Sequence, residues 1–397
     1  MDFSDIWRTP LLEDNHRALA ERLLDWSIPE IDEEPEDFRA PVLTLLTAMA
    51  AEGILDLIIP EPGTRIDLRA VCLAREIISY RSGGLADSAF TMQGIGTAPL
   101  WLSGNDTLAS QYLPRAKTGS AIAAFALTEQ AAGSDVANIE TSAVRDGDAY
   151  VLNGTKTFIT NAGIADHYII VARTGEAPGA RGLSAFLVDS DTKGLSTTAQ
   201  HFIAPHAGGE LAITDCRIGA DRLIGVPGGG FALAMSTFDI FRASVGAAAL
   251  GLARRAFDEA LTRTAERELF GRKMIEMDGV QSRLAQMTTA LEGASLLVYR
   301  AAWAKDTTGK RCTREVSMAK LVATEAADRV VDAAVQLFGG AGVMKGSVVE
   351  RLYREIRPMR IYEGASEVQE LVIGRDLARQ QMKARVDKDK SPMSKKD

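Results

Sequence analysis

The sequence predicts a mainly α-helical protein with a central β domain, because two helical regions flank a segment rich in β-forming residues. Apolar side chains recur at helical spacing in the first 120 residues, for example at Leu19, Leu23 and Leu24. Short β-branched and aromatic runs then replace that pattern, and the helical period returns later in the chain. We therefore expect an N-terminal helical domain over residues 1–120, a middle antiparallel β domain over 121–226 and a C-terminal helical bundle over 227–378.

Four runs in the middle region have the composition of β-strands: Ala149–Leu152, Thr157–Thr160, Tyr168–Ala172 and Leu183–Val188. The dipeptide Asn153-Gly154 separates the first two runs. Both of its residues tolerate positive φ, which a type I′ turn requires. This dipeptide therefore predicts a β-hairpin.

Three long stretches rich in Ala and Leu follow the β region: Phe231–Ala265, Gln281–Ala304 and Ser317–Phe338. The short connections between them favour antiparallel helices packed as a bundle. The last segment, 379–397, holds seven Lys or Arg against three Asp and has no apolar periodicity after Val386. We expect a disordered basic tail there, with an anion-binding arm as the alternative.

The composition restricts the partners and the compartment. A net charge of −8 gives no overall attraction for nucleic acid or anionic membranes. The three cysteines are widely spaced, which favours a reducing compartment over a disulfide framework. The first residues lack the basic and apolar regions of a signal peptide, and no uninterrupted apolar run is long enough to span a bilayer. We expect a cytoplasmic protein that binds neither membrane nor nucleic acid.

Several catalytic classes lack their usual motifs in this sequence. It has no motif for zinc hydrolysis, serine hydrolysis, NTP cleavage or Rossmann-type nicotinamide binding. The four histidines have no third ligand type at metal spacing, so we expect no metal site.

The Glu363-Gly364 step near the C-terminus is the first feature that indicates catalysis. A carboxylate followed by a glycine on a turn lets a flat substrate or cofactor approach the backbone closely. The alternative is that Glu363 only favours the dipole of a following helix. A second feature is the loop with Thr128, Gly133 and Ser134, which could hydrogen-bond an anionic or heteroaromatic ligand.

Six ordered motifs resemble those of the acyl-CoA dehydrogenase family. The resemblance runs from about residue 40 to residue 378. The motifs are Ala126-Leu-Thr-Glu-x-x-Ala-Gly-Ser-Asp135, Asn153-Gly-x-Lys-x-Phe-Ile-Thr-Asn161, Phe238–Arg242, Arg267–Gly271, Gln336–Gly342 and Ile361–Gln369.

The resemblance implies an N-terminal helical domain, a middle β domain and a C-terminal four-helix bundle, with FAD as cofactor. It also implies α,β-desaturation of an acyl-CoA thioester to a trans-2-enoyl-CoA, with electrons passed to an electron-transfer flavoprotein. Glu363 would remove the α-proton while flavin N5 accepts the β-hydride. Some relatives carry the base at positions matching Ile240 or Phe241, neither of which can accept a proton. Because an apolar site raises the pKa of a carboxylate, we expect strong pH dependence.

Binding residues also follow from the resemblance. The flavin ring and ribityl chain would contact Phe125, Leu127, Thr128, Ser134, Phe158, Thr160, Ala365 and Glu367. The FAD of a neighbouring subunit, in a homotetramer built as a dimer of dimers, would contact Arg267, Phe270, Gln281, Gln336, Gly339 and Gly340. The acyl-CoA would contact Ser134, Asp239, Arg242 and Arg375, with Gly364 against the thioester.

The acyl group itself is left open by the sequence. Relatives that accept glutaryl thioesters carry an Arg that falls near Asp87, so an acidic acyl tail is disfavoured. If Asp87 lines the pocket, it would favour a polar or cationic tail. Three other classes also stay open: a flavin oxidase of the same fold, a desaturase of carrier-protein thioesters, and a DNA-associated relative, which only the basic tail favours.

Overall fold

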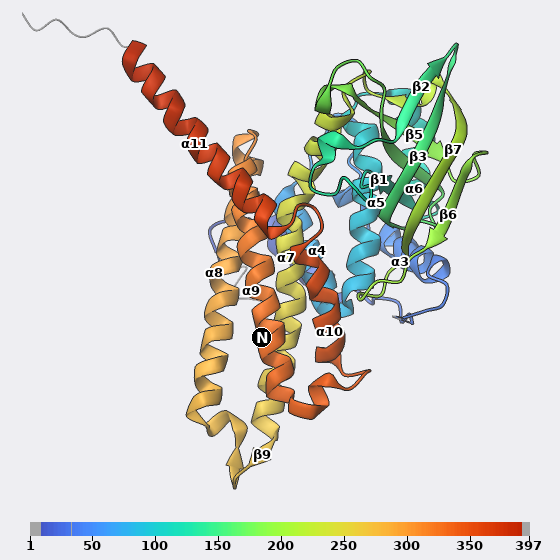
Figure 1. Cartoon of the computed structure of the whole chain (residues 1–397). Helices are drawn as coiled ribbons and strands as arrows, with labels where there is room; N and C mark the ends of the chain where they lie inside the picture. The colour runs from blue at the N-terminus through green and yellow to red at the C-terminus, as the bar shows by residue number, and fades with distance from the viewer. Residues whose placement is uncertain (1–8, 33, 391–397) are drawn as a thin grey trace, which may run out of the picture.

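The computed structural model describes residues 9–32 and 34–390. Along the chain a β-sheet region comes between two helical regions, and in space it lies at one side of the helices (Figure 1). This order confirms the predicted fold class. The N-terminal helices are α2 (Asp14–Asp25), α3 (Arg39–Ala51), α4 (Leu68–Ser82), α5 (Gly84–Leu102) and α6 (Asp106–Lys117). Most residues of α4 and α5 are buried, because α4 packs against the C-terminal bundle and α5 packs against both that bundle and the sheet.

The central sheet is mainly antiparallel but mixed, so the expectation of an antiparallel domain needs a correction. Its strands run in the order β6-β7-β3-β2-β4-β5-β8, while β1 pairs with β4 in parallel and β2 meets β4 through one parallel pair. Continuous apolar runs such as β1 and β4 suit parallel pairing, since strands buried on both faces need not alternate. The strands are β1 (Ala123–Ala126), β2 (Ser142–Asp146), β3 (Ala149–Thr160), β4 (His167–Arg173), β5 (Leu183–Asp189), β6 (Leu195–Ala199), β7 (Gly208–Gly219) and β8 (Leu223–Ile224).

The hairpin predicted at Asn153-Gly154 is wrong, because β3 runs through this dipeptide without turning. Its register against β7 shifts between Leu152 and Gly154, which marks a bulge. Gly154 has φ +152°, and a Cβ there would lie 2.7 Å from the Cα of Thr141. The glycine therefore permits close approach of a neighbouring segment.

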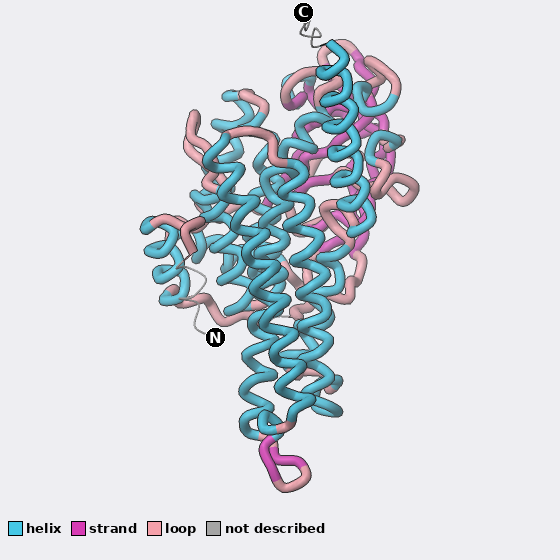
Figure 2. Tube along the Cα trace, turned by 90° about the vertical axis from the view of Figure 1, so that its left-hand side faces the viewer, coloured by secondary structure: helices cyan, strands magenta, loops and turns pink. Residues whose placement is uncertain are grey.

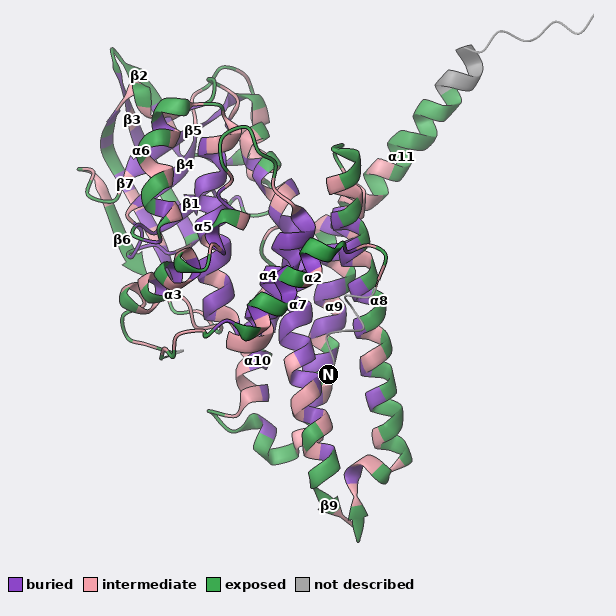
Figure 3. Ribbon diagram, turned by 180° about the vertical axis from the view of Figure 1, so that it is seen from behind, coloured by how far each residue is buried: buried purple, intermediate pink, exposed green. Residues whose placement is uncertain are grey.

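Long helices form the C-terminal region, and they lie side by side in Figure 2. Helix α7 (Gly230–Glu266) is long and apolar enough to cross a membrane by length and composition alone, yet 72% of its most apolar window is buried inside the protein. Figure 3 shows the buried middle of this helix between its neighbours, as expected for the core helix of a bundle. The elements are α7 (Gly230–Glu266), a hairpin of β9 (Glu268–Leu269) and β10 (Arg272–Lys273), α8 (Asp278–Thr308), α9 (Thr313–Phe338), α10 (Val348–Ile356) and α11 (Ser366–Lys390).

The disordered tail expected from Arg379 is wrong for its first part, since α11 continues as far as Lys390. Arg, Gln, Met, Lys and Ala dominate this stretch and are good helix formers. They extend a helix that has already begun at Ser366, so no new nucleation is needed. Residues 391–397 lie outside the described residues.

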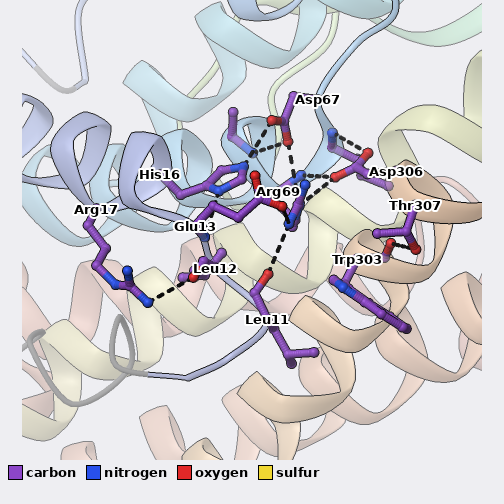
Figure 4. Close-up of polar contacts among 12 residues, drawn as sticks. Leu11, Leu12, Glu13, His16, Arg17, Asp67, Arg69, Trp303, Asp306 and Thr307 are labelled. Carbon is purple, nitrogen blue, oxygen red and sulfur yellow. Dashed lines mark hydrogen bonds and ion pairs between the residues drawn. The ribbon is translucent and has the colours of Figure 1, made fainter.

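A polar cluster joins the N-terminal helices to the end of α8 (Figure 4). Asp67 caps α4 by accepting from the backbone N–H of Ala70 at 3.1 Å, and it lies 2.9 Å from Nε2 of the buried His16. Arg69 donates to Asp306 at 3.0 Å and to Glu13 at 2.9 Å. Segments far apart in sequence are thus held together by charge-assisted hydrogen bonds.

We predict that Asp67→Ala lowers the free energy of unfolding by about 1 kcal/mol or more, because it removes an N-cap and the partner of His16. Urea unfolding followed by circular dichroism measures the loss. Asp14→Ala is the matched control, since this carboxylate is fully exposed and only pairs with Arg17 on its own helix. Equal unfolding midpoints for the two variants would contradict the prediction.

Candidate active site

One cavity lies where the three regions meet, with an empty volume of about 1040 Å³ that includes its open mouth. Side chains from α4, α5, the sheet, α7, α10 and the segment before α11 line it. Six residues predicted from the sequence lie on this one cavity, although they are far apart in the chain: Phe125, Leu127, Thr128, Phe158, Thr160 and Glu363.

The Glu363-Gly364 step forms a strained turn on the cavity wall. Glu363 has φ +51° and Gly364 has φ +95°. A left-handed conformation costs a residue other than glycine of order 1–3 kcal/mol, so surrounding contacts must hold it. At Gly364 a Cβ would lie 2.3 Å from Nε2 of Gln369, which explains the glycine.

Three buried side chains hold the carbonyl groups of this turn. Arg242 of α7 donates from Nε to the carbonyl of Glu363 at 3.2 Å. Lys320 of α9 donates to the carbonyl of Gly364 at 2.9 Å, and Gln369 of α11 donates to the same oxygen at 2.8 Å. Donors from three helices therefore fix the direction of the Glu363 side chain.

The carboxylate of Glu363 is available for chemistry. Its Oε2 is buried and accepts no hydrogen bond from the described residues. Burial raises the pKa of Glu363, and the cations Arg75, Arg242 and Lys320 oppose that rise. The residue keeps some solvent contact because the cavity opens onto it. Protein atoms nevertheless surround the carboxylate closely enough for desolvation to be the largest effect on its pKa. Such a group is a suitable general base near neutral pH.

Lys320 is affected by the same environment. Burial lowers its pKa to about 8, although the nearby charge of Glu363 opposes that shift. An ammonium group under the turn therefore balances part of the carboxylate's charge.

The opposite wall of the cavity suits a flat heteroaromatic group. Phe158 sits at a second bulge in β3 with φ +57°, and its side chain is left 54% exposed at the cavity. The hydroxyl groups of Thr128 and Thr160 line the same wall and make no hydrogen bond within residues 9–32 and 34–390. An exposed aromatic ring beside free hydroxyl groups fits the isoalloxazine of FAD.

Asp239 and Arg242, predicted to contact CoA, lie on α7 beneath the turn. Both are buried, and Arg311 donates to Asp239 at 2.6 Å. Asp239 therefore already has a cationic partner, and the clearest contact of Arg242 is with the backbone of Glu363.

Other predicted residues do not line the cavity. Ser134 is exposed in the loop after β1, Arg375 is exposed on α11, and Ala365 and Glu367 lie at the start of α11. A further six are at or near the ends of α7, α8 and α9, where Figure 1 shows the β9 hairpin at the tip of the bundle: Arg267, Phe270, Gln281, Gln336, Gly339 and Gly340. Within one chain, this group is separate from the Glu363 cavity.

Sequence reasoning missed four polar groups at the site: Arg75, Glu355, Tyr362 and Lys320. Arg75 binds Asp87 with two hydrogen bonds, of 2.8 and 2.7 Å, and both residues are buried. Asp87 does line the cavity, but this guanidinium neutralises it, so Asp87 alone does not favour a cationic acyl tail. Arg75 and Asp87 are on consecutive helices, and no sequence motif predicts that they pair.

Three family models match the chain: the acyl-CoA dehydrogenase N-terminal domain over residues 10–120, the middle domain over 124–216 and the C-terminal domain over 228–378. The cyclohexane-1-carbonyl-CoA dehydrogenase of Geobacter metallireducens is 40% identical over 313 residues, 78% of this chain and 82% of that protein. A subunit of the caffeyl-CoA reductase-Etf complex of Acetobacterium woodii is 36% identical and covers 90% of this chain and 94% of its own.

A solved glutaryl-CoA dehydrogenase from Mycobacterium smegmatis in complex with FADH2 superimposes with a TM-score of 0.84 at 26% identity, covering 92% of this chain and 95% of that one. The chain therefore belongs to the acyl-CoA dehydrogenase family. It is an FAD-dependent oxidoreductase of that family.

We predict that Arg75→Met lowers the free energy of unfolding by about 3–5 kcal/mol, because it leaves the buried carboxylate of Asp87 without its cation. Replacing both partners, as Arg75→Met with Asp87→Leu, should cost less than the single change, since no charge is then left unpaired. Urea unfolding of both variants measures the difference. A double variant less stable than Arg75→Met would contradict this account of the pair.

Proposed function

We propose that the enzyme desaturates an acyl-CoA thioester between its α and β carbons, with Glu363 as the base. The observation that carries this proposal is the free carboxylate of Glu363, which faces the same cavity as the flavin wall of Phe158 and Thr160. A thioester between the two walls would have its α-proton on the side of the base and its β-hydrogen towards the flavin.

The chain's own residues prepare the proton transfer. Arg242, Lys320 and Gln369 hold the backbone of the turn, so the carboxylate is already oriented before substrate binds. Glu363 takes the α-proton, and the substrate forms a double bond as its β-hydrogen leaves as hydride. Bound FAD supplies the hydride acceptor.

We further propose that Ser134, Asp239, Arg242, Gly364 and Arg375 bind the CoA side of the substrate, and that Phe125, Leu127, Ala365 and Glu367 belong to the flavin surroundings. Support for a second subunit comes from Phe270, which is 96% exposed at the tip of the bundle with φ +54°. An exposed aromatic ring held in a strained conformation suits a partner surface. We propose a cytoplasmic homotetramer in which Arg267, Gln281, Gln336, Gly339 and Gly340 act with Phe270 on a neighbour's FAD.

An electron-transfer flavoprotein is the proposed electron acceptor, because a relative 36% identical to this chain is a subunit of a reductase-Etf complex. Because that relative is named a reductase, reduction of an enoyl-CoA is the second candidate function. The same residues would then act in reverse, with Glu363 returning a proton to the α-carbon. Anaerobic equilibration from the acyl-CoA and the enoyl-CoA side shows which direction is favoured.

We predict that Glu363→Gln slows anaerobic bleaching of the flavin by acyl-CoA about 10²–10⁴-fold, the usual contribution of a general base. Stopped-flow absorbance measures the rate with a panel of straight, branched, cyclic and aromatic acyl-CoAs. Glu370→Gln is the control, because this exposed carboxylate is on the next helix and outside the cavity. Rapid bleaching by Glu363→Gln would exclude this residue as the base.

The bleaching rate should also rise with pH. Glu363 must be ionised to accept a proton, and burial moves its pKa above the ordinary value of 4.5. The rate should therefore be low where Glu363 is protonated and increase as the pH passes upward through the raised pKa. Single-turnover rates measured across pH with one reactive acyl-CoA test this. A profile already flat from pH 4.5 upward would contradict it.

A further inference from the structure

The part of the cavity formed by α4, α5 and α10 carries more polar groups than an alkyl chain needs. Arg75, Asp87, Ser88, Thr91 and Glu355 all line it, together with apolar side chains such as Met92 and Met359. Polar side chains buried beside an acyl group are costly unless they bind something. Only a group with unused hydrogen-bonding capacity would bind a ligand in this way.

The Arg75–Asp87 pair has little capacity left. Arg75 uses Nε and one terminal nitrogen on Asp87, and it donates from the other to Ser244 at 3.0 Å. Thr91 makes a longer contact with Asp87, at 3.4 Å. The pair therefore carries no net charge, and most of its hydrogen-bonding groups are already used within the protein.

Glu355 is different. It is only 5% exposed, lines the cavity, and its Oε2 has no hydrogen-bond partner among the described residues. Its other oxygen lies 3.8 Å from Nε of Arg351. Gly83 and Gly84, at the start of α5, leave room for the carboxyl group, since a Cβ on either would lie 3.1–3.2 Å from its atoms.

Glu355 is also separate from the catalytic turn. Arg75, Asp87 and both glutamates line the same cavity, so the ion pair shares this space with the two carboxyl groups. Glu355 is on α10, whereas Glu363 follows that helix and its succeeding turn. A ligand that fills the cavity from Glu363 would therefore also reach Glu355.

We propose that the cavity accepts an acyl group bearing a hydroxyl on its distal part, and that Glu355 is the hydrogen-bond partner of this hydroxyl. The inference rests on the proposed desaturation and specifies its substrate class. A carboxylate tail would be repelled by the ionised form of Glu355, and an ammonium tail would have to be desolvated beside a carboxyl group whose charged form burial disfavours. An uncharged hydroxyl avoids both conflicts and satisfies Oε2.

The protonation of Glu355 agrees with a neutral ligand. Burial raises the pKa of this carboxyl group to about 7, against the opposing effects of Arg351 and of the backbone N–H of Gly84. Both protonation states are then present near neutral pH. A hydroxyl donates to the ionised form and accepts from the protonated form, so it suits either one.

Matched pairs of thioesters test the proposal on the FAD-loaded enzyme. ω-Hydroxyacyl-CoAs of short and medium length are compared with unsubstituted acyl-CoAs of equal length, and 3-(4-hydroxyphenyl)propanoyl-CoA with 3-phenylpropanoyl-CoA. We expect the best hydroxylated substrate to exceed its unsubstituted partner at least about tenfold in kcat/KM, as one added hydrogen bond to a carboxyl group provides. Equal or higher values for the unsubstituted partners in every pair would overturn the proposal.

Variants then assign the preference to Glu355. Glu355→Met should remove it, whereas Glu355→Gln, which keeps the shape and can still hydrogen-bond, should retain it. Glu350→Gln is the control on the same helix, because this carboxylate pairs with Arg354 and does not line the cavity. A preference that persists in Glu355→Met would overturn the role of Glu355. If Glu355→Met does not fold, Ser88→Ala tests the neighbouring hydroxyl group of the cavity. A preference that Ser88→Ala retains supports Glu355 as the partner, and a preference that it loses would contradict the proposal.

The two proposals fail in distinguishable ways. Absence of flavin bleaching with every thioester would show that the desaturation itself is wrong. Bleaching by unsubstituted thioesters without any advantage for hydroxylated ones would leave desaturation intact and exclude the inferred substrate class.

Discussion

The left-handed turn at Glu363 is the constraint on which the active site depends. Its backbone is unfavourable for a residue with a side chain, and hydrogen bonds from α7, α9 and α11 compensate for that cost. The three helices must pack in register before Arg242, Lys320 and Gln369 can reach the two carbonyl groups. Catalytic geometry in this enzyme is therefore a property of bundle packing, not of the local sequence around Glu363.

Buried charges have a related role on the opposite wall. Lys156, inside β3, donates to Glu129 at 2.7 Å and to the carbonyl of Leu127 at 2.9 Å. Glu129 in turn accepts from the backbone N–H groups of Glu140 and Thr141. These contacts fix the loop that presents Leu127 and Thr128 to the cavity. Paired buried charges are weak sources of net stability, but breaking one is costly, so such pairs define geometry well.

Besides Asp87, which is paired with Arg75, two carboxyl groups line the cavity in different electrostatic settings. Glu363 is influenced by the three cations Arg75, Arg242 and Lys320 and shares its cavity with the proposed flavin wall, while Glu355 lies 3.8 Å from Arg351. Burial raises the pKa of both, but only Glu363 is held on a strained turn. Position relative to the flavin wall, and not acidity, separates the proposed base from the proposed substrate-binding group.

The sequence alone determined the order of helical and β regions and the motifs that surround the proposed flavin wall and the proposed base. These depend on periodicity and on short-range spacing, which a single chain displays directly. Only the tertiary structure decided that β3 passes straight through Asn153-Gly154, that Arg75 neutralises Asp87, and that Arg242 and Lys320 hold the turn at Glu363. Each of these depends on which segments meet across long separations in the chain. Tertiary packing decides these contacts. The sequence around a hydrogen-bond donor or a glycine does not indicate which distant group that residue will contact.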